Sequence, residues 1–274
     1  MTGSEEKRTL LIVSSLASFL VPYTVSSLNV ALPAISGAFG LDAITLGWVT
    51  SVYMLTAAVC IVPFGKIADI YGRKRIFLVG NLLFVAGSLF AAVSWAGYAL
   101  IAARIVQGLG GAMVFSTSIA IITAVFSPGE RGRAIGIVTA TVYAGLSLGP
   151  FLGGILTQHA GWPSIFLLNV PLGLAVITLT FLRVRGEWAE AGERAFDLPG
   201  SVLYGLMLIG CIYGLTLLPS FLGILWMGAG LLLLSVFLWW ERRSSHPVLD
   251  PSLFSKNPVF LYSNLAALIN YAVV

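Results

Sequence analysis

Charged residues are missing from most of this chain, and this distribution limits what it can fold into. The chain has 15 basic and 11 acidic residues among 274. Its charged fraction is 9%, against ~25% in an average soluble domain. The charge-free stretches are residues 9–41, 43–65, 76–103, 105–129, 134–182 and 198–240. Since a helix that crosses a bilayer needs ~20 apolar residues, the sequence predicts an all-α, polytopic membrane protein.

The last two stretches are each long enough for two helices. Turn-like sequences divide them, HAGWPS at 159–164 and LLPSFLG at 217–223. A ninth span is expected to begin near Pro258. The eight complete spans are predicted near residues 10–32, 43–64, 76–94, 98–126, 134–157, 164–182, 198–218 and 222–240.

The basic residues predict the orientation of these spans. When the loops are assigned alternately to two sides, one side receives 14 of the 15 Lys and Arg residues. The opposite loops carry a single charge, Asp42. Because basic loops stay on the cytoplasmic side, we expect a multi-pass protein of the cell membrane with a cytoplasmic N-terminus.

The stretch GKIADIYGRKR, residues 65–75, carries five charges and is expected to be a cytoplasmic turn between the second and third spans. Sidedness accounts for its basic residues, but not for Gly65, Asp69 and Gly72. The stretch resembles the signature G-x-L-A-D-R-x-G-R-K of the major facilitator superfamily of transporters, except that Ile70 replaces an Arg.

The resemblance implies a cytoplasmic gate. Its aspartate would pair with charges or a helix N-terminus in the other half of the transporter, and a plain solvated loop is the alternative. The implied gate residues are Gly65, Asp69, Gly72, Arg73 and Lys74.

The fourth span contains RIVQGLGG, which is similar to the family pattern R-x-x-Q-G-x-G-G. Arg104 lies well inside the span, and an intramembrane Arg is by default a functional residue facing a cavity or partner. The alternative is a side chain that reaches outward to the interface. The predicted coupling and cavity residues are Arg104 and Gln107, with Thr24, Ser26 and Asn29 from the first span. For the serines, bonding to their own helix is the alternative.

The fifth span contains GLSLGPFLGG, which resembles the antiporter signature G-x-x-x-G-P-x-x-G-G of the superfamily. Its fixed positions are Gly145, Gly149, Pro150, Gly153 and Gly154. The resemblance implies a hinge, because a glycine-lined helix bent by proline can pivot against its neighbours. Simple helix packing through small residues is the alternative.

The order of the spans resembles the fourteen-helix drug:proton antiporters of this superfamily. We therefore expect a six-helix domain at residues 1–187, a linker with two inserted helices at 188–245, and the start of a second domain at 246–274. On this interpretation five further helices are missing, and the absent C-terminal half is the chain's main partner.

The resemblance implies export of small amphipathic or cationic compounds across the lipid bilayer by alternating access, driven by a proton gradient. Thr24 stands where the family usually has an acidic residue, and the eight predicted spans contain no Asp or Glu. A coupling carboxylate is therefore expected at Asp69 or in the missing half. We expect no enzyme activity, catalytic residues, cofactor or metal, because P-loop and zinc motifs are absent from the sequence. We also expect no nucleic-acid partner, because the basic residues are dispersed over several short loops. The alternatives are a facilitative or uptake carrier and a non-transporting half-protein.

Overall fold

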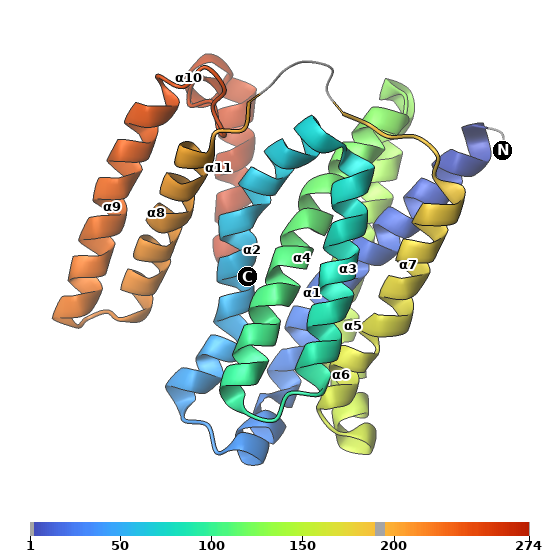
Figure 1. Ribbon diagram of the computed structural model, residues 1–274, viewed down its shortest axis with the longest axis vertical. Helices are drawn as coiled ribbons and strands as arrows, with labels where there is room; N and C mark the ends of the chain where they lie inside the picture. The colour runs from blue at the N-terminus through green and yellow to red at the C-terminus, as the bar shows by residue number, and fades with distance from the viewer. Residues whose placement is uncertain (1–2, 190–194, 274) are drawn as a thin grey trace. The chain divides into compact units, whose positions relative to one another are not determined.

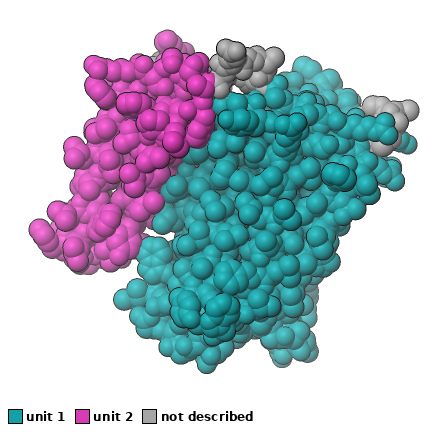
Figure 2. Space-filling model, viewed as in Figure 1, with its two compact units in different colours: residues 1–192 teal, residues 193–274 magenta. Residues whose placement is uncertain are grey.

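The computed structural model describes residues 3–189 and 195–273, and every regular element in these ranges is a helix. The chain forms two compact units, residues 1–192 and residues 193–274, which Figure 2 shows in teal and magenta. Eight of the described helical segments are long and apolar enough to cross a membrane, as the sequence predicts.

The first unit is a bundle of long helices joined by short connections (Figure 1). Helices α6 and α7 together form one candidate span, broken at Leu168. The bounds are α1 Gly3–Phe39, α2 Ala43–Tyr71, α3 Arg73–Ala92, α4 Gly97–Val125, α5 Pro128–Ala160, α6 Pro163–Leu167 and α7 Asn169–Arg183.

The second unit contains α8 Leu198–Thr216, α9 Phe221–Glu241, α10 Ser252–Lys256 and α11 Pro258–Val273. The helices α8 and α9 approach closely through glycines. A Cβ atom on Gly214 would lie 2.5 Å from the backbone nitrogen of Met227. The predicted start of the ninth helix at Pro258 is confirmed.

The predicted turn at residues 65–75 is wrong in its extent. Helix α2 continues through Lys66 and Asp69 to Tyr71, and α3 begins at Arg73. Only Gly72 lies outside a helix, with a φ of 112° that favours glycine. With 29 residues, α2 is longer than the ~20 needed for a span, so its charged end extends beyond its apolar part.

The other end of α2 is fixed by Asp42, the acidic residue predicted for an outer loop. Its side chain caps the helix by accepting the Thr45 N–H at 3.2 Å. Hydrogen bonds from Thr45 lower the pKa of the Asp42 carboxyl.

Within the first unit, α3 and α4 pack against one another through glycines. A Cβ atom on Gly80 would lie 2.5 Å from the Met113 Cβ, and one on Gly87 would lie 2.6 Å from the Gln107 nitrogen. At Gly110, an added Cβ would overlap the backbone of Phe84. Small residues allow this close approach, which replaces the hydrophobic driving force that helices lack in a membrane.

We expect Gly110→Ala to lower the unfolding temperature of the purified protein in detergent. Overpacking of this kind costs ~1–3 kcal/mol, since backbone cannot move aside as a flexible side chain can. Gly136→Ala in α5 is the matched control, because its added Cβ would meet open space. The control should keep or raise the unfolding temperature, since Ala has the higher helix propensity. Equal effects of the two substitutions would contradict the close packing of α3 on α4.

Candidate functional site

Arg104 of α4 is completely buried inside the first unit, with 0% of its surface exposed. Its Nε donates a hydrogen bond to the Val49 carbonyl of α2 at 3.1 Å, and its Nη1 donates to Gln107 Oε1 at 2.5 Å. The guanidinium also lies 4.2 Å from the centre of the Tyr53 ring. The side chain therefore points into the bundle and not outward to the interface.

The polar contacts continue from Arg104 to other helices. Gln107 Nε2 donates to Ser88 Oγ of α3 at 2.7 Å. Asn169, the first residue of α7, donates from Nδ2 to Thr24 Oγ1 of α1 at 2.9 Å and to Ser88 Oγ at 3.4 Å. We call this the Arg104 network, and its members are Thr24, Ser88, Arg104, Gln107 and Asn169. It links α1, α3, α4 and α7, with α2 attached through Val49.

Two members of the network, Ser88 and Asn169, were not predicted from the sequence, and Asn169 is the one that carried a signal. A polar residue within the apolar run of the sixth span was the available signal, since such residues are costly there unless they are paired. Its position is set by the break between α6 and α7, which places Asn169 at the start of α7.

The electrostatics of the network rest on a single charge. Among the described residues, Arg104 is paired with a carbonyl, an amide and an aromatic ring, and no carboxylate is hydrogen-bonded to it. A buried Arg keeps its proton at physiological pH, and the hydroxyl of Thr24 does not ionise. The network can therefore hold its helices together, while proton exchange needs a different group.

The other predicted cavity residues of α1 have different surroundings. Ser26 is buried in the contact with α5, where its Oγ donates to the Pro22 carbonyl at 3.0 Å and to the Gly145 carbonyl at 3.2 Å. Asn29 is exposed on the first unit. The lining of a substrate cavity by these residues stays a prediction.

The glycines of the fifth span form the contact between α5 and α1. A Cβ atom on Gly145 would lie 2.5 Å from the Phe19 carbonyl oxygen, and one on Gly153 would lie 2.8 Å from the Ser27 Cα. At Gly149 an added Cβ would overlap the Ser26 side chain. Gly145, Gly149 and Gly153 are buried at intervals of four residues, whereas Pro150 of the same signature is exposed. The two helices thus meet along a smooth, glycine-lined face.

We expect Gly149→Ala to lower thermal stability, because its methyl group would push Ser26 out of the contact with α5. Gly154→Ala is the control within the same signature, since its added Cβ would lie 3.8 Å from Val30, an ordinary contact distance. The unfolding temperatures of the two purified variants in detergent test the prediction. A Gly149→Ala variant as stable as the control would show that this close approach is dispensable.

The predicted gate residues are brought together where α2 meets α3. The Asp69 Oδ1 is paired with Arg73 Nη2 at 2.7 Å and accepts a hydrogen bond from Arg73 Nε at 2.8 Å. Arg73 Nη1 also donates to the Ala120 carbonyl of α4 at 3.2 Å. The pairing of Asp69 with the missing half stays a prediction, and within the described residues this carboxylate pairs with Arg73, four residues along the chain.

The gate glycines differ in the space around them. A Cβ on Gly65 would lie 3.8 Å from the Ser116 Cβ, an ordinary contact, so a methyl group would fit there. Gly72 has the positive φ described above, and a Cβ there would meet the Glu187 side chain.

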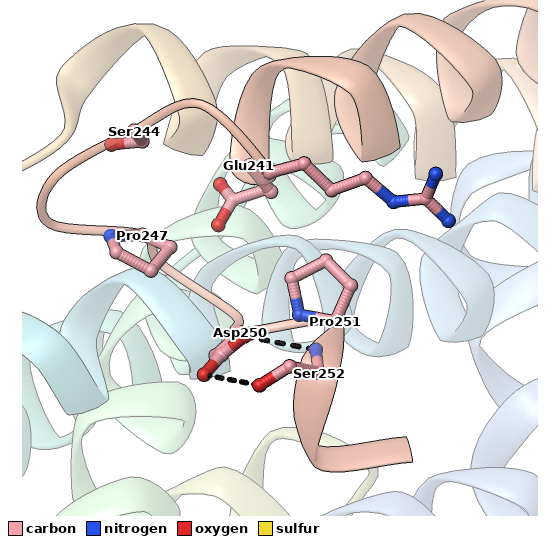
Figure 3. A pocket seen from close by; sticks show the side chains of 7 residues that line it. Glu241, Ser244, Pro247, Asp250, Pro251 and Ser252 are labelled. Atoms are coloured by element: carbon pink, nitrogen blue, oxygen red, sulfur yellow. Dashed lines mark hydrogen bonds between the residues drawn. The ribbon is translucent and has the colours of Figure 1, made fainter. Parts of the chain in front are cut away.

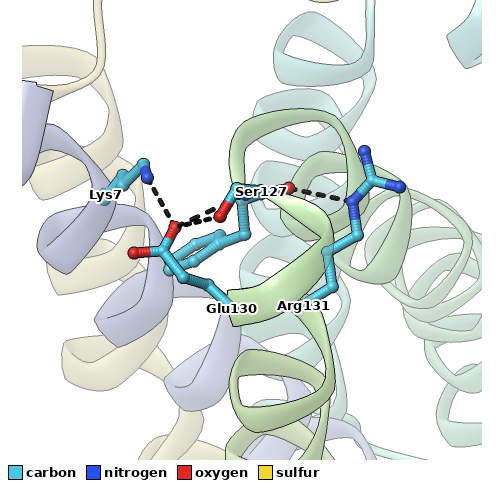
Figure 4. A network of polar contacts seen from close by, with 5 residues as sticks. Lys7, Ser127, Glu130 and Arg131 are labelled. Carbon is cyan, nitrogen blue, oxygen red and sulfur yellow. Dashed lines mark hydrogen bonds and ion pairs between the residues drawn. The ribbon is translucent and has the colours of Figure 1, made fainter.

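A second polar cluster joins the N-terminal ends of α1 and α5 (Figure 4). Lys7 Nζ lies 2.7 Å from Glu130 Oε2, which also accepts a hydrogen bond from the Ser127 hydroxyl. Arg131 Nε donates to the Phe126 carbonyl at 2.8 Å. The Lys7 and Glu130 side chains are 35% and 54% exposed, so water screens this ion pair and it contributes little to stability.

Two carboxylates are buried in the described part of the second unit. Asp197 caps α8 by accepting the Gly200 N–H at 2.8 Å, and it also accepts the Trp240 Nε1–H at 3.0 Å and the Ser244 hydroxyl at 2.9 Å. Glu241 is only 2% exposed and accepts the Leu249 N–H at 3.0 Å. Glu241 is the last residue of α9 and lies one residue beyond the predicted span at 222–240.

Glu241 also borders a pocket of about 480 Å³ (Figure 3). Ser252 is fixed to Asp250 there by two hydrogen bonds of 2.9 Å. No group of three or more potential metal ligands occurs among the described residues. The pocket is lined by Glu241, Arg242, Ser244, Pro247, Asp250, Pro251 and Ser252.

The first unit combines a buried polar network with glycine-packed spans, and the second unit adds the α8–α9 pair. These features define a polytopic membrane protein. Residues 14–273 match the Major Facilitator Superfamily. Since this match covers nearly the whole chain, the protein belongs to the Major Facilitator Superfamily.

Several curated proteins are similar to the chain. It is 38% identical over 252 residues to the multidrug resistance protein Stp of Mycobacterium tuberculosis, covering 89% of this chain and 46% of that protein. It is 30% identical to the tetracenomycin C resistance and export protein of Streptomyces glaucescens, over 96% of this chain and 50% of that one. It is 33% identical to the riboflavin transporter RibZ of Clostridioides difficile, over 73% of this chain and 44% of that one. The chain spans about half the length of these relatives.

Proposed function

We propose that this protein takes part in the export of small amphipathic or cationic compounds across the cell membrane by alternating access. The observation that carries this proposal is its family membership together with relatives named for drug resistance and export. The glycine-lined contact of α1 with α5 supports it, because two smooth helices can change their mutual angle without side-chain clashes. We propose a carrier and not an enzyme.

In this mechanism the two helical halves of a complete carrier move around a central site, as in other secondary transporters. Arg104 and Gln107 hold the first six-helix domain together inside the bundle, and Asp69 with Arg73 forms the gate at the cytoplasmic end. The glycines of α5 provide the hinge. The C-terminal half, the fourteen-helix arrangement and the cytoplasmic N-terminus belong to the same proposal.

We further propose that a proton gradient drives export. The Arg104 network lacks a carboxylate among the described residues, so the coupling group would be one of the acidic residues elsewhere. Asp69 stays a candidate, and Asp197 and Glu241 are two further candidates, because they are the buried carboxylates of the described second unit.

A second candidate function is facilitative or uptake transport. It is favoured by the similarity to a protein named as a riboflavin transporter, since that name specifies no export. The fold and the gate would be the same in both cases, and only the direction and coupling of transport would differ.

Inverted membrane vesicles that contain the natural protein test export directly. We expect a lipophilic organic cation to accumulate inside energised vesicles and to dissipate their internal acidity as it enters. Arg104→Ala should reduce the initial rate about tenfold or more, the effect of ~1.4 kcal/mol on a barrier, because the network would lose its charged centre.

Arg133→Ala is the matched control, since Arg133 is exposed at the start of α5 and its loss should leave the rate unchanged. The amount of each variant in the membrane fraction is measured alongside. Full activity of Arg104→Ala would remove this residue from the mechanism. Accumulation without any change in internal acidity would favour the facilitative alternative.

A further inference from the structure

The first turn of α3, which follows the gate glycine, is capped by a segment more than a hundred residues away in sequence. We call this segment the strap, residues 184–188, which directly follows α7. Glu187 Oε1 accepts the Lys74 N–H at 2.9 Å, and the Trp188 carbonyl accepts the Arg73 N–H at 2.9 Å. The first N–H groups of a helix have no partner within the helix. Gly72, at the cap position, has no side chain to supply one.

The contact between the strap and α3 is reciprocal. Lys74 Nζ donates to the Val184 carbonyl at 2.6 Å, where α7 ends. A cation at a helix C-terminus and an anion at a helix N-terminus are both favoured by the helix dipoles. A Cβ on Gly72 would lie 2.6 Å from Glu187 Oε1, so a side chain there would displace this carboxylate, and the φ angle of 112° favours glycine.

The strap is also anchored to α1 and to the core. Glu6 Oε1 of α1 accepts the N–H groups of Arg185 at 2.9 Å and Gly186 at 3.1 Å. The Val184 side chain is 1% exposed and belongs to a buried cluster. The members of that cluster are Leu10, Val13, Ala17, Phe77, Val114, Ile121, Val176 and Val184. The strap therefore has a fixed position from which it can hold α3.

Arg73 connects the strap to the gate. Its backbone N–H is bound by Trp188 of the strap, and its guanidinium holds Asp69. The orientation of the first turn of α3 thus determines where the Arg73 side chain can reach, and Glu187 caps that turn at the adjacent residue.

We propose that Glu187 is a positioning residue for the gate and that it acts as a hydrogen-bond acceptor for the Lys74 N–H. Its ion pair with Arg75 is secondary, because the two charged groups are 3.6 Å apart and the Arg75 side chain is 76% exposed. The inference adds to the proposed function a control point that lies outside the gate motif.

The test uses Ala68, which is 1% exposed and whose carbonyl accepts the Gly72 N–H. For the experiment, Ala68→Cys is introduced into the natural protein, and Cys60 and Cys211 are replaced by Ser. All variants below are made in this parent protein. A membrane-impermeant maleimide labels it in inverted vesicles. Glu187→Met keeps the length of the side chain but removes both the charge and the oxygen acceptor. Glu187→Gln also removes the charge but keeps an oxygen acceptor. We expect Glu187→Met to raise the labelling rate about fivefold, in line with the loss of one helix cap, and Glu187→Gln to stay near the parent rate.

Glu5→Met is the positional control, because Glu5 is exposed near the same end of the bundle. It should label like the parent protein, and so should Arg75→Ala. If Glu187→Met fails to reach the membrane, Glu187→Ala provides a second removal of the acceptor. In transport assays, loss of the acceptor should lower turnover and leave the KM for the compound unchanged.

A parental labelling rate in the variants that lack the acceptor would overturn the proposal. Equal increases in Glu187→Met and Glu187→Gln would also overturn it, since the charge and not the cap would then be responsible. Labelling needs no transported compound, so its outcome can be distinguished from a failure of the export proposal.

Discussion

The charge of Arg104 must be satisfied by the protein itself, because it is completely buried in a bundle whose helices are suited to a membrane. The Val49 carbonyl, the Gln107 amide and the Tyr53 ring surround it. Gln107 in turn requires Ser88, and Ser88 lies beside Asn169. One buried charge therefore fixes the relative positions of helices that are distant in sequence.

Close packing through glycines makes this polar network possible. The Gly87 position brings α3 so near to α4 that Gln107 can reach Ser88. The glycines of α5 have a similar effect on α1, where the Ser26 hydroxyl reaches the Gly145 carbonyl. In both places the absence of a side chain permits a hydrogen bond between helices. The antiporter-like signature is therefore a packing surface, which is also what a hinge between these two helices requires.

Much of the fold could be predicted from the sequence, because the cost of charge in a bilayer limits where a span can lie. The eight spans follow from the charge-free stretches, and the glycines of α5 follow from their spacing. The end of α2 could not be predicted from hydropathy. A helix can carry Lys66 and Asp69 beyond the apolar part of its span, and hydropathy cannot separate such an extension from a turn.

The partners of the site residues could not be predicted in the same way. Asn169 meets Thr24 across 145 residues of sequence, and Glu187 meets Lys74 across 113. No periodicity connects positions so far apart, since their proximity depends on how all the helices pack. The distant partner that the sequence indicated for Asp69 stays a prediction, and the local geometry around Gly72 places Arg73 next to this carboxylate.

The central claim is that the gate is bound into its own helical unit by the strap and is not a free loop. Hydrogen–deuterium exchange of the natural protein in lipid nanodiscs tests this claim most directly. Peptides that cover residues 72–75 and 184–187 contain the amides bound by Glu187, Trp188 and Glu6. The account predicts that these amides exchange as slowly as those in the next turn of α3. Exchange at the rate of an unprotected loop in both peptides would contradict it.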